Sequence, residues 1–389
     1  MMNTNILIIG AGIAGLCAAK EATAKGVKVE VIEQKEDVST NGVEYITKTN
    51  LRQLNIKSNP DWILNTTDGF TLNSPDNNRI VLDDSTIAMP EKSYIVDLDK
   101  FNKDLKKMAL DSNAEIYFNS KATGISRNGS SVVVTVDNTD IGEITTDILI
   151  IAEGLDSNMT KEVNLDYDLS DKNTRSIVQY KVKSVNVGAN NNINMYFGSV
   201  APGGYAWILP VDENNAYIGL STLNSNDSDS EELLDNFLSE KLDDYTIIDK
   251  ESRILPINGI SRERVDDNIM ITGDAAGFIN PLTNMKLEDV IASGIYAGVV
   301  AGELIFTGED LDKVYMQKFT MYTDMLINED TERYNETRKF LLSLSDDDFN
   351  IIASQLENAE MYESDIDNII RYMIENCSKP GLQLKKLYA

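Results

Sequence analysis

The stretch NILIIGAGIAG, Asn5 to Gly15, decides the fold of this chain. An apolar run enters three glycines at the spacing GxGxxG, and an alanine-rich segment follows. The pattern predicts a buried strand, a tight turn and a helix. Gly10 would allow the turn, Gly12 would let the backbone approach a diphosphate, and Gly15 would let the helix pack closely on the strand. We therefore expect a dinucleotide at the amino end of this helix.

A second strand and a terminal acid complete the nucleotide pattern. After a helix over 13–25, the segment 28–32 predicts a strand that leads into Glu33. A carboxylate at this place would accept hydrogen bonds from ribose hydroxyls and repel a 2′-phosphate. We interpret the whole as a βαβ dinucleotide-binding unit, and a tight strand–helix turn without a ligand is the alternative.

Composition excludes several classes of function. The chain has 389 residues, 42% of them apolar, which is enough for two or three domains with large cores. Its 35 basic and 63 acidic residues give a formal charge of −28, so we expect no nucleic acid partner. The sequence has no histidine, which excludes Ser-His-Asp catalysis and imidazole metal ligands, and we expect no metal site.

Other features bear on the compartment. The two cysteines, Cys17 and Cys377, form no CxxC motif, and the N-terminus lacks the cationic region of a signal peptide. We expect a cytoplasmic protein, with association to a membrane surface left open. The apolar run from Val290 to Phe306 is rich in glycine and alanine and carries Glu303, which favours a core helix over a membrane span.

The ends of two later predicted strands help to decide whether the dinucleotide is FAD or NAD. DILIIAEGLDS covers 147–157, and IMITGDAAG covers 269–277 and ends its strand at Gly273 and Asp274. An aspartate at such a strand end would bond the ribityl chain of a flavin. Three pieces in this order favour FAD over NAD. A second GxGxxG for a nicotinamide dinucleotide is absent from the sequence, so the reductant would dock transiently or be another redox protein.

The chain resembles the geranylgeranyl reductase family of FAD flavoproteins over residues 1–310. The resemblance is carried by GAGIAG, Glu33, AEGLDS, GDAAGFINPLT and PGGYAWILP, the last from Pro202 to Pro210. The fold class expected is α/β (α+β): a Rossmann-like FAD-binding domain, an antiparallel-sheet substrate domain and a helical C-terminal region. We assign 1–60, 95–170 and 262–310 to the first domain, 61–94 and 171–261 to the second, and 311–389 to the third.

The resemblance also implies site residues. Tyr205 and Trp207 would line an apolar substrate cavity, although a strand with two buried aromatic side chains is the alternative. Tyr205 and Glu44 are candidates for the proton donor, and the catalytic residue itself is not determined. The implied cofactor contacts, with the glycines of the turn, are Gly10, Gly12, Ala14, Gly15, Glu33, Gly42, Val43, Tyr45, Ala122, Asp274, Lys286 and Leu287.

Three departures from the family pattern stand out. Gly42 replaces a loop cysteine, Leu98 replaces an arginine, and the segment 284–286, Asn-Met-Lys, replaces a glycine run. Met and Lys do not adopt positive φ cheaply, so the last change would weaken a close backbone approach to the cofactor. Lys286 would return a cation near the flavin or diphosphate.

The resemblance implies reduction of isolated C=C bonds in geranylgeranyl chains of archaeal-type membrane lipids, by hydride transfer from reduced flavin. The partners implied are an isoprenoid lipid, met at the membrane surface, and an electron donor, either a reduced ferredoxin-like protein or NAD(P)H. Two alternatives stay open: an FAD-dependent, hydroxylase-like oxidoreductase acting on another apolar substrate, and a non-catalytic paralogue that binds lipid or a partner.

Overall fold

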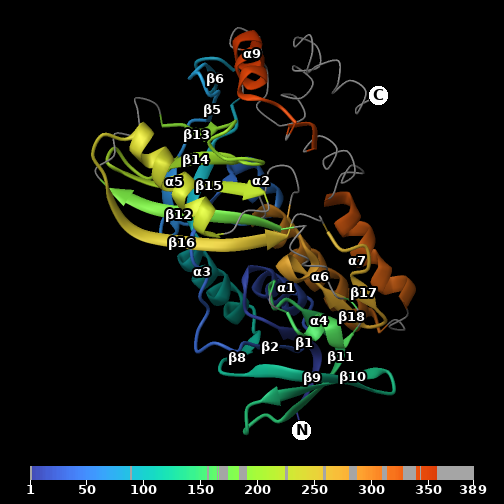
Figure 1. Ribbon diagram of the computed structural model, residues 1–389. Helices are drawn as coiled ribbons and strands as arrows, with labels where there is room; N and C mark the ends of the chain where they lie inside the picture. The colour runs from blue at the N-terminus through green and yellow to red at the C-terminus, as the bar shows by residue number, and fades with distance from the viewer. Residues whose placement is uncertain are drawn as a thin grey trace. The chain divides into compact units, whose positions relative to one another are not determined.

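A computed structural model describes residues 2–87, 90–155, 157–163, 165, 174–183, 191–223, 227–256, 260–279, 287–308, 313–326, 339–341 and 343–356. The chain divides into two compact units, each built from three separate segments (Figure 1). Unit 1 comprises 1–41, 98–169 and 257–331, and unit 2 comprises 42–97, 170–256 and 332–389.

Unit 1 is built on an eight-stranded sheet with a parallel centre. The parallel neighbours of β1 are β11 on one side and β2 on the other, and β8 and β18 extend the parallel part. All four residues of β2 are buried, as expected for a strand covered on both faces. The strands are β1 (Met2–Ile9), β2 (Val29–Ile32), β8 (Glu115–Tyr117), β9 (Lys121–Asn128), β10 (Ser131–Asp137), β11 (Glu143–Ile151), β17 (Val265–Asp266) and β18 (Ile269–Ile271).

Two helices of unit 1, α1 (Ile13–Thr23) and α6 (Leu287–Thr307), pack through small residues (Figure 1). A Cβ on Gly294 would overlap the backbone of Ala14, and a Cβ on Gly298 would overlap the backbone of Ala18. One turn further, Gly302 lies against the backbone of Ala22. The absence of side chains at spacing i, i+4 and i+8 therefore lets the two helix backbones come close together.

This packing accounts for the long apolar helix near 290–306. By length and composition α6 is the one helix of the described residues that could span a membrane, and 61% of its most apolar window is buried within the protein. Since Gly294 and Gly298 lie against α1, the prediction of a core helix is confirmed. The other helices among the described residues of unit 1 are α3 (Leu98–Asp111), α4 (Met159–Glu162), the 3-10 helix η2 (Gly273–Ala276) and α7 (Lys313–Leu326).

Unit 2 contains a seven-stranded, mainly antiparallel sheet in the order β16-β12-β15-β14-β13-β5-β6, and a three-stranded sheet in the order β3-β7-β4. The strands of the larger sheet are β5 (Phe70–Asn73), β6 (Arg79–Leu82), β12 (Thr174–Lys183), β13 (Ile193–Tyr196), β14 (Tyr205–Pro210), β15 (Asn215–Leu223) and β16 (Thr246–Pro256). The smaller sheet has β3 (Val43–Thr47), β4 (Ile63–Thr66) and β7 (Ser93–Asp97). The helices that the structure describes in unit 2 are α2 (Lys48–Gln53), α5 (Asp227–Lys241) and α9 (Asp346–Leu356).

The two faces of the larger sheet have different coverings. One face, with Val178, Ala206 and Ile218, packs against Leu234 and Phe237 of α5, which Figure 1 shows across the strands. The other face carries Ile193, Trp207 and Leu209, and these pack with Val43 and Ile95 of the smaller sheet. Because side chains alternate along a strand, one sheet builds two apolar layers.

The observed units differ from the expected domains in two main respects. The region 311–389, expected as a third domain, is divided, with 311–331 in unit 1 and 332–389 in unit 2. Residues 42–60, assigned above to the first domain, lie in unit 2, because β3 pairs with β7 along its length. Helix α5 of unit 2 begins at Asp227, within the polar run 225–232 of the sequence. In the region after 310, expected to be helical, α7 and α9 are helices, and much of the rest lies outside the described residues.

Candidate functional site

The turn after β1 contains three glycines, of which two are closely packed against backbone atoms and one borders open space. Gly10 has φ +102°, and a Cβ there would overlap the carbonyl oxygen of Ala152, while a Cβ on Gly15 would overlap the carbonyl oxygen of Gly10. Around Gly12, in contrast, nothing lies within 4 Å of where a Cβ would be. No side chain caps α1 at Gly12. The turn thus leaves open space at a helix amino end, where a diphosphate would bind.

Two side chains hold this turn in place. The Ala11 N–H donates to Oε2 of Glu33 at 2.8 Å, and Asn102 of α3 donates through Nδ2 to the Ala11 carbonyl at 3.4 Å. Oε1 of Glu33 accepts the Lys35 N–H at 2.9 Å. A carboxylate has about four acceptor positions, so Glu33 retains acceptor capacity for ribose hydroxyls.

The strand that carries Ala122 lies at the same edge of the sheet. Just before β9, the Ser120 N–H donates to the Glu33 carbonyl at 2.8 Å. Ala122 itself is buried, with 3% of its surface exposed, and pairs with Val136 of β10. The structure therefore brings Ala122 into the neighbourhood of the Glu33 edge.

The late segment GDAAG meets the start of α1. A Cβ on Gly273 would lie 2.7 Å from Cβ of Ala14, so Asp274, in η2, is next to the amino end of that helix. The Gly273 N–H donates to Oγ of Ser293 in α6 at 3.2 Å. Leu287, the first residue of α6, is buried.

Together, the turn, the Glu33 carboxylate and the GDAAG segment form an edge that fits a dinucleotide. The open backbone at Gly12 matches a diphosphate, and Asp274 supplies an acceptor further along. Lys286, with Asn284 and Met285, lies outside the described residues. The compensating role expected of Lys286 therefore stays a prediction.

The predicted cofactor contacts Gly42, Val43 and Tyr45 lie in unit 2, at and before β3. Gly42 has φ +94°, and a Cβ there would lie 2.6 Å from a carboxylate oxygen of Glu251. Both the backbone angle and the space favour glycine at this position. A cysteine side chain in place of Gly42 would therefore be strained.

The proton-donor candidate Glu44 has a cationic partner. Its Oε1 lies 3.1 Å from Nη2 of Arg253 on β16, and 14% of the Glu44 side chain is exposed. This ion pair links β3 to the edge strand of the larger sheet. The structure gives Glu44 a structural partner within unit 2, and its catalytic role stays a prediction.

Tyr205 and Trp207 lie on one face of β14, with ring centroids 5.7 Å apart. The row of rings continues to Phe197, 5.9 Å from Tyr205, and to Phe349 of α9, 6.0 Å from Phe197. All four side chains are partly exposed. They form an apolar aromatic surface, which the sequence indicated only for its first two members.

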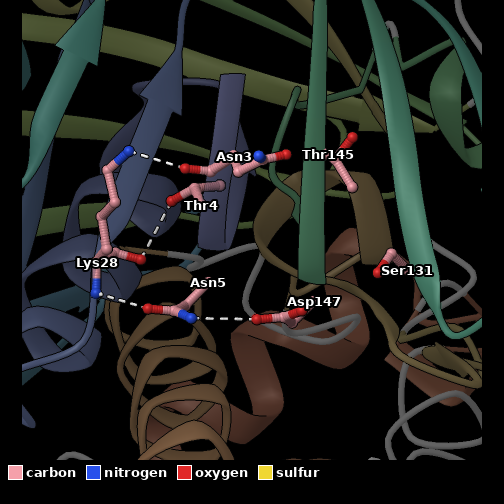
Figure 2. Close-up of a pocket in the computed structure, with 7 residues that line it drawn as sticks. All are labelled: Asn3, Thr4, Asn5, Lys28, Ser131, Thr145 and Asp147. Atoms are coloured by element: carbon pink, nitrogen blue, oxygen red, sulfur yellow. Dashed lines mark hydrogen bonds between the residues drawn. The ribbon is translucent and has the colours of Figure 1, made fainter. Parts of the chain in front are cut away.

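The structure also contains a polar hollow of about 300 Å³ at the other end of the central strands. Figure 2 shows hydrogen bonds among its residues: the Asn5 side chain donates to Asp147 at 3.1 Å and accepts from the backbone N–H of Lys28 at 3.2 Å. Thr4 donates to the Lys28 carbonyl at 3.2 Å. These bonds join β1 and β11 to Lys28, the residue before β2, away from the carboxyl ends of the strands, where ligands of such sheets bind. We assign the hollow a structural role.

Other candidate groups are also engaged in structure. Cys17 is buried in α1, and burial raises the pKa of its thiol to about 12, so the thiolate needed for redox chemistry does not form near neutral pH. In the basic cluster of α3, Lys103, Lys106 and Lys107 each form an ion pair with an aspartate, at 2.5 to 2.6 Å. These ion pairs give the three lysines partners within the protein itself.

Comparisons with known proteins agree with this architecture. A geranylgeranyl reductase catalytic domain matches residues 173–255, and an NAD(P)-binding Rossmann-like domain matches residues 8–68. A solved structure of a geranylgeranyl bacteriochlorophyll reductase-like protein from Thermoplasma acidophilum has a TM-score of 0.90 and 25% sequence identity, with all of both chains covered.

Two curated relatives are similar along their length. Digeranylgeranylglycerophospholipid reductase 2 of Methanosphaera stadtmanae is 33% identical over 395 residues, which is 100% of both chains. Digeranylgeranylglycerophospholipid reductase 1 of Methanothermobacter thermautotrophicus is 30% identical, over 99% of this chain and 98% of its own. This chain therefore belongs to the digeranylgeranylglycerophospholipid reductase family.

Proposed function

We propose that this protein is an FAD-dependent reductase that saturates C=C bonds of geranylgeranyl chains in archaeal-type membrane lipids. The observation that carries the proposal is 33% identity over the whole chain to a reductase named for such a lipid. The dinucleotide edge of unit 1 and the aromatic surface of unit 2 supply the two kinds of surface that this reaction needs. Neither the hydroxylase-like alternative nor the non-catalytic one has a specific observation in its favour.

The residues proposed to hold FAD are the cofactor contacts expected from the sequence. In unit 1, Gly12 and the amino end of α1 would bind the diphosphate, Glu33 would bind the ribose, and Asp274 would bind the ribityl chain. Bound there, FAD supplies the hydride chemistry. The other proposed contacts of this chain are Gly10, Ala14, Gly15, Ala122, Leu287 and Lys286, and, from unit 2, Gly42, Val43 and Tyr45.

The residues proposed to hold the lipid are Tyr205 and Trp207. An isolated alkene has no polar group to orient it, so shape and apolar contact must place the reacting carbons. Partly exposed aromatic rings provide rigid apolar area at low entropic cost. Tyr205 also carries a hydroxyl, and it remains our first candidate for the proton donor, with Glu44 as the second.

The electron donor and the membrane contact belong to the same proposal. The lipid substrate places the enzyme at a membrane surface without a need to span it. We propose either a reduced ferredoxin-like protein or NAD(P)H as the donor, in keeping with the single GxGxxG of the sequence. Anaerobic reduction of the bound flavin by each donor in turn separates these two possibilities.

The first experiment is a visible absorption spectrum of the purified protein, followed by anaerobic reduction in the presence of a geranylgeranyl glycerophospholipid. We expect a flavin spectrum that bleaches on reduction, and a lipid product that gains hydrogens in pairs, read by mass spectrometry. A colourless protein that FAD does not reconstitute would contradict the proposal. Peroxide release in air without lipid reduction would favour the hydroxylase-like alternative.

A further inference from the structure

One row of paired residues crosses six strands of the larger sheet in unit 2. From β16 to β5 the residues in register are Glu251, Gln179, Gly219, Trp207, Met195 and Leu72. Neighbouring strands in register point their side chains to the same face, so these residues form one transverse row. We call it the Trp207 row.

The glycine in this row makes room for the indole. A Cβ on Gly219 would lie 2.6 Å from Cζ2 and 2.7 Å from Cε2 of Trp207. The ring of Trp207 therefore lies over β15 at the point where that strand has no side chain. This lets the indole of β14 reach across β15 toward β12.

On β12 the indole meets a buried amide. Trp207 donates from Nε1 to Oε1 of Gln179 at 2.9 Å, and Gln179 donates from Nε2 to the Val43 carbonyl at 3.3 Å. Only 6% of Gln179 is exposed. An amide has one acceptor end and one donor end. If the Gln179 amide were reversed, its NH2 group would face the Trp207 N–H and its oxygen would face the Val43 carbonyl, and neither pair can form a hydrogen bond. Both bonds together fix the orientation of the side chain.

The same row meets the segment that begins at Gly42, the residue that stands in place of a cysteine of the family pattern. Gly42 lies against the carboxylate of Glu251, and Val43 receives the hydrogen bond from Gln179. Gln179 is thus bonded on one side to the ring proposed to contact lipid and on the other to the start of β3. A shift of either group would be transmitted to the other through this amide.

We propose that Gln179 is a positioning residue, which holds Trp207 flat across Gly219 as a wall for the isoprenoid chain. This inference rests on the proposed function for the identity of the ligand. The rest of the wall is the aromatic surface of Tyr205, Phe197 and Phe349. Without the bond from Gln179, the indole loses the polar contact that fixes its side-chain torsions, and the position of the wall is less well defined.

The test uses the full-length protein, labelled with 5-fluorotryptophan. The chain has only two tryptophans, Trp62 and Trp207, so only two fluorine resonances are expected. Trp62 is completely buried, and the variant Trp62→Phe assigns the two fluorine resonances. Gln179→Met keeps similar volume and removes both hydrogen bonds. The control, Asn194→Leu, removes a buried amide from the opposite face of the same sheet.

We expect Gln179→Met to shift and broaden the Trp207 resonance and to leave the Trp62 resonance in place. The Kd of the oxidised protein for a geranylgeranyl glycerophospholipid should rise about tenfold, the size expected for loss of one or two neutral hydrogen bonds. Asn194→Leu should change neither the Trp207 resonance nor the Kd. A Trp207 resonance that does not move in Gln179→Met, or a Kd within about twofold of wild type, overturns the inference.

A second variant tests the bonds themselves. In Gln179→Glu the protonated carboxyl has both an acceptor and a donor, so lipid binding should match wild type at low pH. As pH rises and the carboxyl ionises, the donor to Val43 is lost and the affinity should fall, while wild type stays level. Equal affinity of this variant at both pH values contradicts the positioning role.

These binding measurements also separate the inference from the proposed function. Lipid that binds wild type with an affinity dependent on Gln179, but is never reduced, refutes the reductase proposal and leaves the positioning role intact. Lipid that does not bind wild type at all overturns the positioning role.

Discussion

The glycine turn of unit 1 and the Trp207 row of unit 2 both depend on a missing side chain, but they use the space differently. At Gly12 the space is left open, and polar backbone groups face it. At Gly219 the space is filled from within by the Trp207 ring. A charged diphosphate is recognised by backbone N–H groups, whereas an apolar chain needs a rigid apolar wall. The same residue type therefore serves opposite kinds of recognition.

The largest effect should come from filling the open space. Gly12→Val places a side chain where no protein atom lies, so the protein should fold while the diphosphate is excluded. We expect FAD affinity to fall on the order of a hundredfold, or more, because the backbone no longer approaches the ligand. Titration by flavin fluorescence quenching measures the affinity, and thermal unfolding of the flavin-free protein should stay at the wild-type temperature.

The matched variant is Gly15→Val, whose side chain would overlap the Gly10 carbonyl. It should lower the stability of the flavin-free protein as well as its affinity for FAD. If the two variants lose stability equally, the distinction between an open and a packed glycine in this turn is wrong.

The next effect concerns the glycines between α1 and α6. Gly298→Ala would bring a methyl group into the backbone of Ala18 and separate the helices. We expect the free energy of unfolding to fall by about 1–3 kcal/mol, as for overpacked cores. Urea unfolding measures it. In the control Gly124→Ala the nearest atom to the new methyl is 3.9 Å away, and its effect should be clearly smaller.

A smaller effect should follow from restoring the cysteine that the family resemblance leads one to expect. Gly42→Cys meets both a positive φ and the Glu251 carboxylate. We expect a loss of about 1–2 kcal/mol in the free energy of unfolding, and no gain in activity. The double variant Gly42→Cys with Glu251→Ala should regain the stability lost through the steric clash with the Glu251 carboxylate. The stability lost through the positive φ at position 42 should not be regained. A stable and more active Gly42→Cys protein would show that the segment rearranges.

The smallest effect is the pH dependence that Cys17 contributes. Burial raises the pKa of this thiol to about 12, above its ordinary value of 9.0. The stabilising contribution is fully present below about pH 9 and is lost as pH rises toward the folded pKa, because the unfolded thiol ionises first. Unfolding of wild type should therefore become easier above pH 9, and Cys17→Ala should flatten that slope. Equal slopes would contradict the burial of an unionised thiol.

The sequence was sufficient for those elements whose signal is local. The strand, turn and helix at Gly10 to Gly15 and the buried helix near Val290 appear in the structure as predicted, since apolar runs and glycine spacing are read directly along the chain. Element ends moved by a few residues; β1, for example, begins at Met2.

Residues whose roles depend on pairing between distant segments could not be found in this way. Gln179 meets Trp207 only because three strands align in register, and Asn102 meets Ala11 only when α3 reaches the glycine turn. Nothing local marks either amide as special. Residues 42–60 fall in unit 2 for a reason of the same kind, because the partner of β3 is more than forty residues away along the chain.

The interleaving of the two units along the chain has a consequence for synthesis on the ribosome. Strand β1 and helix α1 are made first, but α1 packs on α6, which begins at Leu287. Unit 1 therefore cannot complete its helix packing until most of the polypeptide has emerged, and by then the described strands of unit 2 have all been translated. During that interval the apolar face of α1 is exposed to solvent. We therefore expect chaperones to bind the nascent chain at this stage.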